Sequence, residues 1–249
     1  MRLQPVNPFY MADLSTGSAK QETSPAYARL PLAPRTASPV PHLTSLYHFH
    51  RAGEYGDRSY PGNCGGKLIH DLLRFFQPEN VFDPMTGSGT CADVCTELGI
   101  PCLSRDIRHG FDATDPTVFH SLRKQELFDF IWAHPPYWRQ KLYTAKNGDL
   151  SRSPTLEIFL EGYKTFIENC AGVLAPGGKF AILMGDYNDR EAGFISLTHH
   201  TKQLAFAIGL RQHCTDIIRF SHGASSSRKT YRSSFIPGLH DVCMIFEKA

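Results

Sequence analysis

Residues 81–90 read Val-Phe-Asp-Pro-Met-Thr-Gly-Ser-Gly-Thr, and this segment determines which fold the chain is predicted to adopt. Asp83 closes a short apolar strand, predicted over 80–83, and Gly87 and Gly89 then allow a tight turn before the next helix. The segment lacks the GxGxxG dinucleotide pattern, and no lysine follows Gly89 as a phosphate loop would require. An aspartate at a strand end, followed by proline, favours a cofactor-binding loop over a plain strand-to-helix turn.

Helix-like and strand-like segments alternate on either side of this turn. Helices are predicted over 67–76, 91–98, 157–174 and about 194–208, and strands over 80–83, 101–104, 128–133, 179–184, 215–220 and 241–246. The helix over 157–174 has the clearest apolar stripe and is expected to end at Pro176-Gly177-Gly178. Strands that alternate with helices indicate an α/β sheet with helices on both faces.

The composition is typical of a soluble globular chain. Of its 249 residues, 41% are hydrophobic and 20% are charged, which supports one sizeable core but not two independent domains. No apolar run is long enough to span a bilayer and the first residues lack a signal peptide, so we expect a cytoplasmic protein without a membrane partner. Seven of the 17 prolines precede residue 45. They predict an N-terminal arm over 1–45, either flexible or draped on the core, before a single domain over 46–249.

The seven cysteines are scattered along the chain without a CxxC pair, which excludes a disulfide framework. Cys91 and Cys95 are four residues apart and could share one face of a helix. Two thiolates alone do not complete a zinc site, so we predict no metal and interpret these cysteines as small buried side chains. The 12 histidines also lack the spacing of metal ligands.

Further acidic residues follow at the ends of the next predicted elements. Asp106 comes directly after the strand over 101–104, where its carboxylate could accept two hydrogen bonds from a ribose diol. Asp112 lies in the next loop and could accept from an adenine amino group, a role that Asp115 could fill equally well. A solvated surface position is the alternative for each of these carboxylates.

Residues 131–138 read Ile-Trp-Ala-His-Pro-Pro-Tyr-Trp and form the second informative segment. Two prolines after a buried strand stiffen the backbone, so the carbonyl groups of His134 and Pro135 have fixed directions. Tyr137 follows with an aromatic ring. Rigid acceptors beside a stacking surface suit a planar substrate with an exocyclic amine, such as a base flipped out of a duplex.

Together these motifs resemble the amino-methylating DNA methyltransferases, which modify N6 of adenine or N4 of cytosine with S-adenosyl-L-methionine. The resemblance spans about residues 60–246. It implies a Rossmann-like, seven-stranded class I methyltransferase sheet and a DNA substrate, with no metal in the reaction. It implies a cofactor site formed by Asn63, Asp83, Pro84, Thr86, Gly87, Gly89, Asp106 and Asp112. It also implies a catalytic corner formed by His134, Pro135, Pro136 and Tyr137.

His134 departs from the family pattern, which usually has Asp, Asn or Ser before Pro-Pro-Tyr. A histidine accepts a hydrogen bond from the target amine only when it is neutral and the correct ring nitrogen carries the lone pair. Either His134 does so, and activity is sensitive to mild acid, or the backbone carbonyl groups suffice. The choice between adenine and cytosine stays open, as does a catalytically silent nucleic-acid-binding relative.

A basic segment over 217–240 supports a nucleic-acid partner independently. It contains Arg219, Arg228, Lys229 and Arg232, with Tyr231 among them. A solvated basic loop is the alternative, but beside a base-methylation site phosphate binding is the better interpretation. An RNA base-amine methyltransferase is the nearest competing function.

Overall fold

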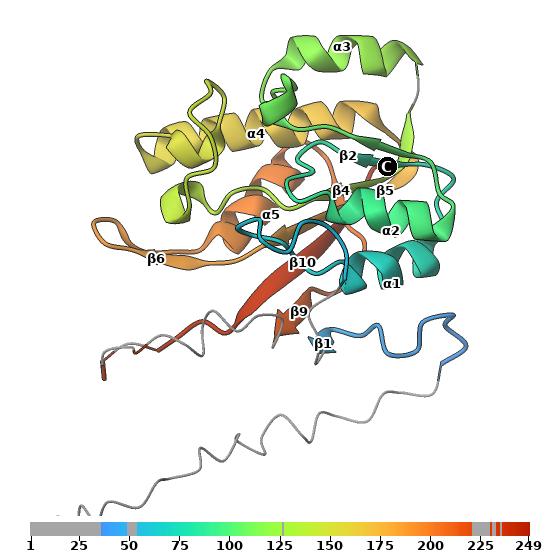
Figure 1. The fold of residues 1–249 in the computed structure, drawn as a ribbon, viewed down its shortest axis with the longest axis horizontal. Coiled ribbons are helices and arrows are strands. Elements are labelled where there is room, and N and C mark those ends of the chain that lie inside the picture. The colour runs from blue at the N-terminus through green and yellow to red at the C-terminus, as the bar shows by residue number, and fades with distance from the viewer. Residues whose placement is uncertain (1–35, 49–53, 126, 221–229, 231–232, 235) are drawn as a thin grey trace, which may run out of the picture. The chain divides into compact units, whose positions relative to one another are not determined.

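The computed structural model describes residues 36–48, 54–125, 127–220, 230, 233–234 and 236–249 (Figure 1). Within these residues the α-helices are α1 (Lys67–Phe76), α2 (Thr90–Leu98), α3 (Pro116–Gln125), α4 (Leu156–Val173) and α5 (Leu197–Ala207). Short 3-10 turns cover Ile107–His109, Trp138–Gln140 and Leu150–Arg152. The strands are β1 (Leu46–His48), β2 (Val81–Asp83), β3 (Cys102–Ser104), β4 (Phe128–Ala133), β5 (Leu174–Met184), β6 (Tyr187–Asp189), β7 (Gly193–Ile195), β8 (Arg211–Gln212), β9 (Ile217–Phe220) and β10 (His240–Glu247).

The main sheet has the strand order β1-β9-β10-β5-β4-β2-β3, and β8 pairs with β10 beside this path. β10 runs antiparallel to β5, β8 and β9, whereas all other neighbouring strands are parallel. β6 and β7 form a separate antiparallel hairpin. Because β2, β3 and β4 are parallel neighbours, their carboxyl ends meet at one edge of the sheet, where open α/β folds bind ligands.

Side chains of the central strands alternate between two apolar cores. Ile131 and Ala133 of β4 pack on the side covered by α3, α4 and α5, whereas Phe130 and Trp132 pack on the side of α1 and α2. Figure 1 shows α1 and α2 next to each other on their side of the sheet. The predicted α/β class with helices on both faces is confirmed. The main path has the seven strands that the resemblance implies, and the two-residue β8 adds an eighth.

Predicted and observed elements agree in position, with one informative exception. α1 and β4 have the predicted bounds. The helix predicted to run to Leu174 stops at Val173, because Leu174 already pairs with Phe128 as the first residue of β5. Pro176-Gly177-Gly178 therefore lies inside the strand, where the pairing with β4 shifts register before Lys179 meets Phe130. The two glycines form an irregularity in the strand rather than a connection before it.

The sequence does not predict β1, α3, the β6–β7 hairpin or the two-residue strand β8. β1 lies next to β9 and is preceded by Val40, which is buried. This segment is tied to α1, because the fully buried Asp71 accepts a hydrogen bond from Tyr47 Oη at 2.7 Å and lies 2.7 Å from His42 Nε2. The predicted arm over 1–45 otherwise falls on residues 1–35, which lie outside the described residues.

Among the described residues, no helix combines the length and the apolar character that a bilayer span requires.

Candidate active site

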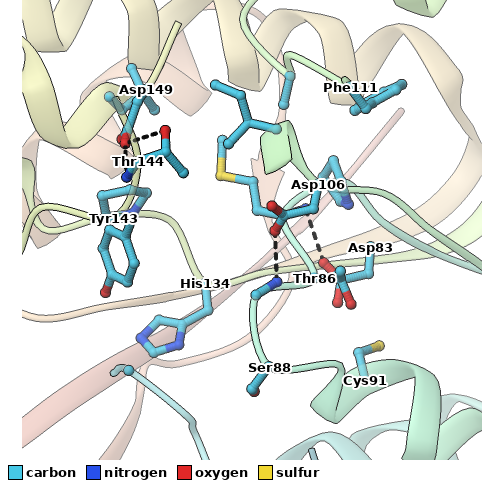
Figure 2. A pocket seen from close by; sticks show the side chains of 18 of the residues that line it. Asp83, Thr86, Ser88, Cys91, Asp106, Phe111, His134, Tyr143, Thr144 and Asp149 are labelled. Carbon is cyan, nitrogen blue, oxygen red and sulfur yellow. Dashed lines mark hydrogen bonds between the residues drawn. The ribbon is translucent and has the colours of Figure 1, made fainter. Parts of the chain in front are cut away.

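One pocket lies at the carboxyl ends of β2, β3 and β4, and side chains from both predicted motifs line it (Figure 2). Asp83 ends β2, Asp106 follows β3 and His134 follows β4. The space between the lining residues, including the part open to solvent, amounts to about 820 Å³. The predicted residues among the lining are Asp83, Pro84, Thr86, Gly87, Asp106, Asp112, His134 and Pro136.

The glycine elbow, which we define as residues 83–90, is held by backbone hydrogen bonds to the end of β3. Arg105 N donates to Asp83 O at 2.8 Å and Thr86 N donates to Arg105 O at 2.9 Å. Gly87 and Gly89 have φ angles of 50° and 82°, in the left-handed region that other residues rarely adopt. Gly89 ends the elbow as the residue before α2. The elbow shape is therefore fixed by its backbone.

Asp106 connects the elbow to the next loop. Its Oδ2 accepts from Gly87 N at 2.9 Å, and its Oδ1 accepts from Arg108 N at 2.9 Å and from Arg108 Nε at 2.8 Å. Burial raises the pKa of Asp106, but the hydrogen bonds from Arg108 and Gly87 outweigh it and lower the pKa below its ordinary value. A carboxylate offers about four acceptor positions, so about one remains on Oδ2. The predicted pair of hydrogen bonds to a ribose diol would require Arg108 to move.

Asp83 lies at the base of the pocket and is 2% exposed. Its Oδ1 accepts from Met85 N at 3.1 Å. Burial raises the pKa of Asp83 well above its ordinary value, and the neighbouring Cys102 adds to the effect. A carboxyl group in this environment favours its neutral form, which can also donate a hydrogen bond.

The proline corner, residues 134–137, lies at the end of β4. His134 lines the pocket, and its Nε2 is 3.0 Å from Tyr137 Oη. Burial, followed by the charge of Asp241, raises the pKa of Tyr137 well above its ordinary value, so its hydroxyl keeps its proton. The Tyr137 ring packs on Gly185, where an added Cβ would lie 2.6 Å from Cε2. Tyr137 is therefore a partner of His134 and does not itself line the pocket.

The opposite wall is a segment that we call the pocket loop, residues 141–153. Asp149 organises it, because its two carboxylate oxygens accept from the backbone N and hydroxyl groups of Thr144 and Ser151. Figure 2 shows the two hydrogen bonds from Thr144. These four hydrogen bonds fill the acceptor positions of Asp149, so it shapes the loop rather than binding a ligand. Lys146 Nζ fastens the loop by donating to Ile107 O at 2.9 Å and Arg108 O at 2.7 Å.

The pocket loop also closes the part of the pocket next to Asp112 and Tyr60. A Cβ at Gly148 would lie 1.8 Å from Asp112 Oδ2, so only glycine allows this close approach. The Tyr143 ring is stacked against Tyr60, with centroids 5.9 Å apart and planes 22° apart. The Arg108 guanidinium lies 4.7 Å from the centre of the Tyr60 ring on the other loop. Two aromatic rings and a cation therefore border this part of the pocket. We call the pair of rings, Tyr60 and Tyr143, the aromatic frame.

Several predicted site residues have other positions. Asn63 does not line the pocket; its amide group donates to Tyr55 O and Asp57 O and accepts from Gly65 N, which holds its own loop together. Gly89 and Pro135 are likewise outside the lining.

The predicted phosphate-binding role of Arg219 is wrong. Its side chain is buried, donates to both oxygens of Asp241 at 2.8 and 2.6 Å, and donates to Cys64 O at 2.6 Å. An arginine with its donors committed inside the protein does not reach a phosphate. Arg228, Lys229 and Arg232 lie outside the described residues.

From the sequence, Tyr60 is expected only as part of the Tyr60-Pro61-Gly62-Asn63 segment, whose resemblance implies contact with the methionine part of the cofactor, and Tyr143 has no expected role. Tyr60 precedes the elbow by more than 20 residues, and Tyr143 belongs to an insert without regular structure. Their proximity arises only when the pocket loop folds back over the elbow. The signals in the sequence are the Tyr60-Pro61-Gly62-Asn63 segment and Gly148-Asp149-Leu150-Ser151, which resemble family segments without indicating that they meet.

The chain matches no protein-family model and no curated protein. Among solved structures it is similar to TTHA0409 of Thermus thermophilus, described as a candidate DNA modification methylase and solved with S-adenosyl-L-methionine, at 20% identity over 55% of this chain and 53% of that chain, with a TM-score of 0.39. It is similar to TrmN from Thermus thermophilus at 19% identity over 73% of this chain and 48% of that chain, with a TM-score of 0.38.

A SAM-dependent methyltransferase from Archaeoglobus fulgidus shows 15% identity over 73% of this chain and 94% of that chain, with a TM-score of 0.45. The chain spans about half the length of TTHA0409 and TrmN. Similarity at this level does not indicate what this chain binds, so its function is argued from the pocket.

Proposed function

We propose that the protein is an S-adenosyl-L-methionine-dependent methyltransferase that modifies an exocyclic amine of a DNA base, N6 of adenine or N4 of cytosine. The observation that carries this proposal is the pocket, which the glycine elbow and the proline corner line together. A methyl donor and its acceptor must share one reaction centre, and neighbouring parallel strands provide adjacent supports for the two.

The cofactor side would use the elbow and the loop after β3. Asp106 retains about one acceptor position for a ribose hydroxyl, and Asp112 lies further along the same wall. Tyr60 and Tyr143 offer electron-rich ring faces, which attract a positively charged group such as a sulfonium. The donor set therefore fits S-adenosyl-L-methionine, which when bound supplies an electrophilic methyl group.

The acceptor side would use His134 and the carbonyl groups of the proline corner. An exocyclic amine is a weak nucleophile because its lone pair is delocalised into the ring. Hydrogen bonds from the amine to the side chain and the backbone carbonyl group of His134, which lines the pocket, would localise that lone pair and hold the nitrogen in place. For His134 Nδ1 to accept, Nε2 must carry the proton and donate to Tyr137 Oη, 3.0 Å away. The proposal therefore requires that the Tyr137 hydroxyl accept from His134 rather than donate to it.

The nucleic-acid contact would come from Arg228, Lys229 and Arg232, which remain predicted phosphate ligands, together with Lys141 of the pocket loop. Arg139 and Lys146 are less suited, because Arg139 pairs with Asp189 and Glu191 while Lys146 holds backbone carbonyl groups. The base would have to leave its duplex to enter the pocket.

The test is methyl transfer from an isotopically labelled donor to mixed DNA and, separately, to mixed RNA, followed by nucleoside mass spectrometry. Labelled N6-methyladenine or N4-methylcytosine in DNA supports the proposal. Label in RNA alone would show that the substrate is RNA instead of DNA. The Asp106→Ala variant is the control that distinguishes this pocket from a contaminating enzyme. Donor binding without transfer to either nucleic acid would point to a catalytically silent relative and contradict the proposed function.

A further inference from the structure

Three cysteine side chains converge beneath the glycine elbow. Cys91 and Cys95 lie one turn apart on α2, and Cys102 is the first residue of β3, so strand and helix bring together sulfurs that are separate in the sequence. The three Sγ atoms lie within 4.8 Å of one another. The sequence analysis found only two of these residues and therefore rejected a metal site, but the fold adds a third.

This arrangement is close to that of a thiolate metal site. Metal–sulfur bonds of about 2.3 Å place the sulfurs of a tetrahedral site roughly 3.8 Å apart, a separation that small side-chain rotations would reach from here. All three cysteines are free thiols in this structure. Cys91 and Cys95 are each 1% exposed, and Cys102 is partly exposed. Ordinary core packing would explain buried cysteines one at a time, but not three sulfur atoms that converge from a helix and a strand.

Cys91 lines the pocket together with Asp83 (Figure 2). Thiolate ligands without nearby imidazole select soft ions.

We propose that Cys91, Cys95 and Cys102 form a three-thiolate binding site for a soft d¹⁰ metal ion. Binding forms three metal–sulfur bonds and releases the thiol protons to solvent, without any change of oxidation state. Zn²⁺, which prefers four ligands, would complete its shell with a water molecule on the pocket side at Cys91. The site does not depend on the proposed methyl transfer.

The test is a titration of the reduced, metal-free full chain with Cd²⁺, whose bonds to thiolate give an ultraviolet charge-transfer band. We expect the band to saturate at one equivalent. Cys95→Ser and Cys102→Ser should each weaken Cd²⁺ binding by at least about 100-fold, because each removes one of three ligands. Cys214→Ser, at an exposed cysteine outside the cluster, should leave the titration unchanged.

Thiol alkylation followed by peptide mass mapping provides a second measurement that needs no variant to fold. Bound Cd²⁺ should protect the partly exposed Cys102 while Cys214 continues to react, whereas burial already shields Cys91 and Cys95. Absence of the charge-transfer band, a band that persists in both Cys95→Ser and Cys102→Ser, or protection at other cysteines would each overturn the proposal.

Discussion

The two sides of the pocket are held in different ways. The glycine elbow depends on backbone hydrogen bonds to β3 and on the carboxylate of Asp106. The proline corner depends on a contact between two side chains, His134 and Tyr137. A backbone-held turn keeps its shape when a side chain changes, whereas a pair that includes histidine depends on protonation and tautomer. Variants on the two sides should therefore separate donor binding from methyl transfer.

The largest effect is expected at His134. Replacing it with alanine removes an acceptor that is needed in the transition state, so kcat should fall by about 100-fold. Donor affinity, measured by calorimetry, should not change, because the elbow is untouched. His134→Asn should recover much of the rate, since the asparagine carbonyl group accepts without a tautomer requirement. If His134→Ala retains full activity, the backbone carbonyl groups are sufficient acceptors.

Asp106→Ala should give the complementary result. It removes the acceptor for the ribose and the tie to Gly87 N, and charged hydrogen bonds of this kind contribute about 1.5–3 kcal/mol each, so the Kd of the donor should rise roughly 10- to 100-fold. Thermal unfolding would verify that the variant is folded. Asp115→Ala is the matched control, because Asp115 is outside the pocket lining. Equal weakening in the two variants would contradict the assignment of Asp106.

A smaller effect is expected from Tyr137→Phe. The variant keeps the ring on Gly185 but loses the hydroxyl group that, in the proposed arrangement, accepts from His134 Nε2–H. One hydrogen bond of about 0.5–1.5 kcal/mol corresponds to a roughly two- to tenfold lower kcat, with unchanged donor affinity. Tyr143→Phe is the control, since it preserves the ring stacked on Tyr60 and does not alter the contact between His134 and Tyr137. Equal rates for Tyr137→Phe and the unmodified protein would remove this role of the Tyr137 hydroxyl.

The same contrast explains how much could be predicted from the sequence. The elbow is local: Asp83, Gly87 and Gly89 lie within one strand-to-helix turn, and Asp106 follows at the next strand end, so strand alternation alone places them together. The aromatic frame is not local, because Tyr60 and Tyr143 meet through two irregular loops that no periodicity describes. The Asp241 partner of Arg219 lies 22 residues away on the neighbouring strand, and strand pairing is what buries the ion pair.

The pocket loop illustrates a further limit of sequence-based prediction. Asp149 has the residue type of a ligand-binding carboxylate, yet Thr144 and Ser151 use its acceptor positions. Cys102 is the opposite case, because an isolated cysteine in the sequence becomes part of a cluster in the fold. In both cases the hydrogen-bonding or spatial neighbours, and not the residue type, determine what the side chain is able to do.

The smallest expected change is the response of donor affinity to acid. Asp106 has a pKa lowered below its ordinary value of 3.8, despite burial, by the hydrogen bonds from Arg108 and Gly87. A carboxylate whose pKa is lower in the folded than in the unfolded chain stabilises the folded state fully at a pH above the unfolded pKa. This stabilisation is lost only as the pH falls through the lowered, folded pKa. Donor Kd should therefore change by less than about twofold between roughly pH 8 and pH 5, a range in which an ordinary Asp also stays ionised.

Methyl transfer should behave differently over the same range, because His134 accepts from the amine only as the neutral imidazole and histidines protonate in mild acid. Calorimetry and initial rates at matched pH values separate the two: kcat should fall on the acid side while Kd stays level. A Kd that follows kcat would place the pH-sensitive group in the elbow and contradict the contrast between the two sides. A level kcat in the native protein, together with full activity in His134→Ala, would assign acceptance of the amine to the backbone of the proline corner alone.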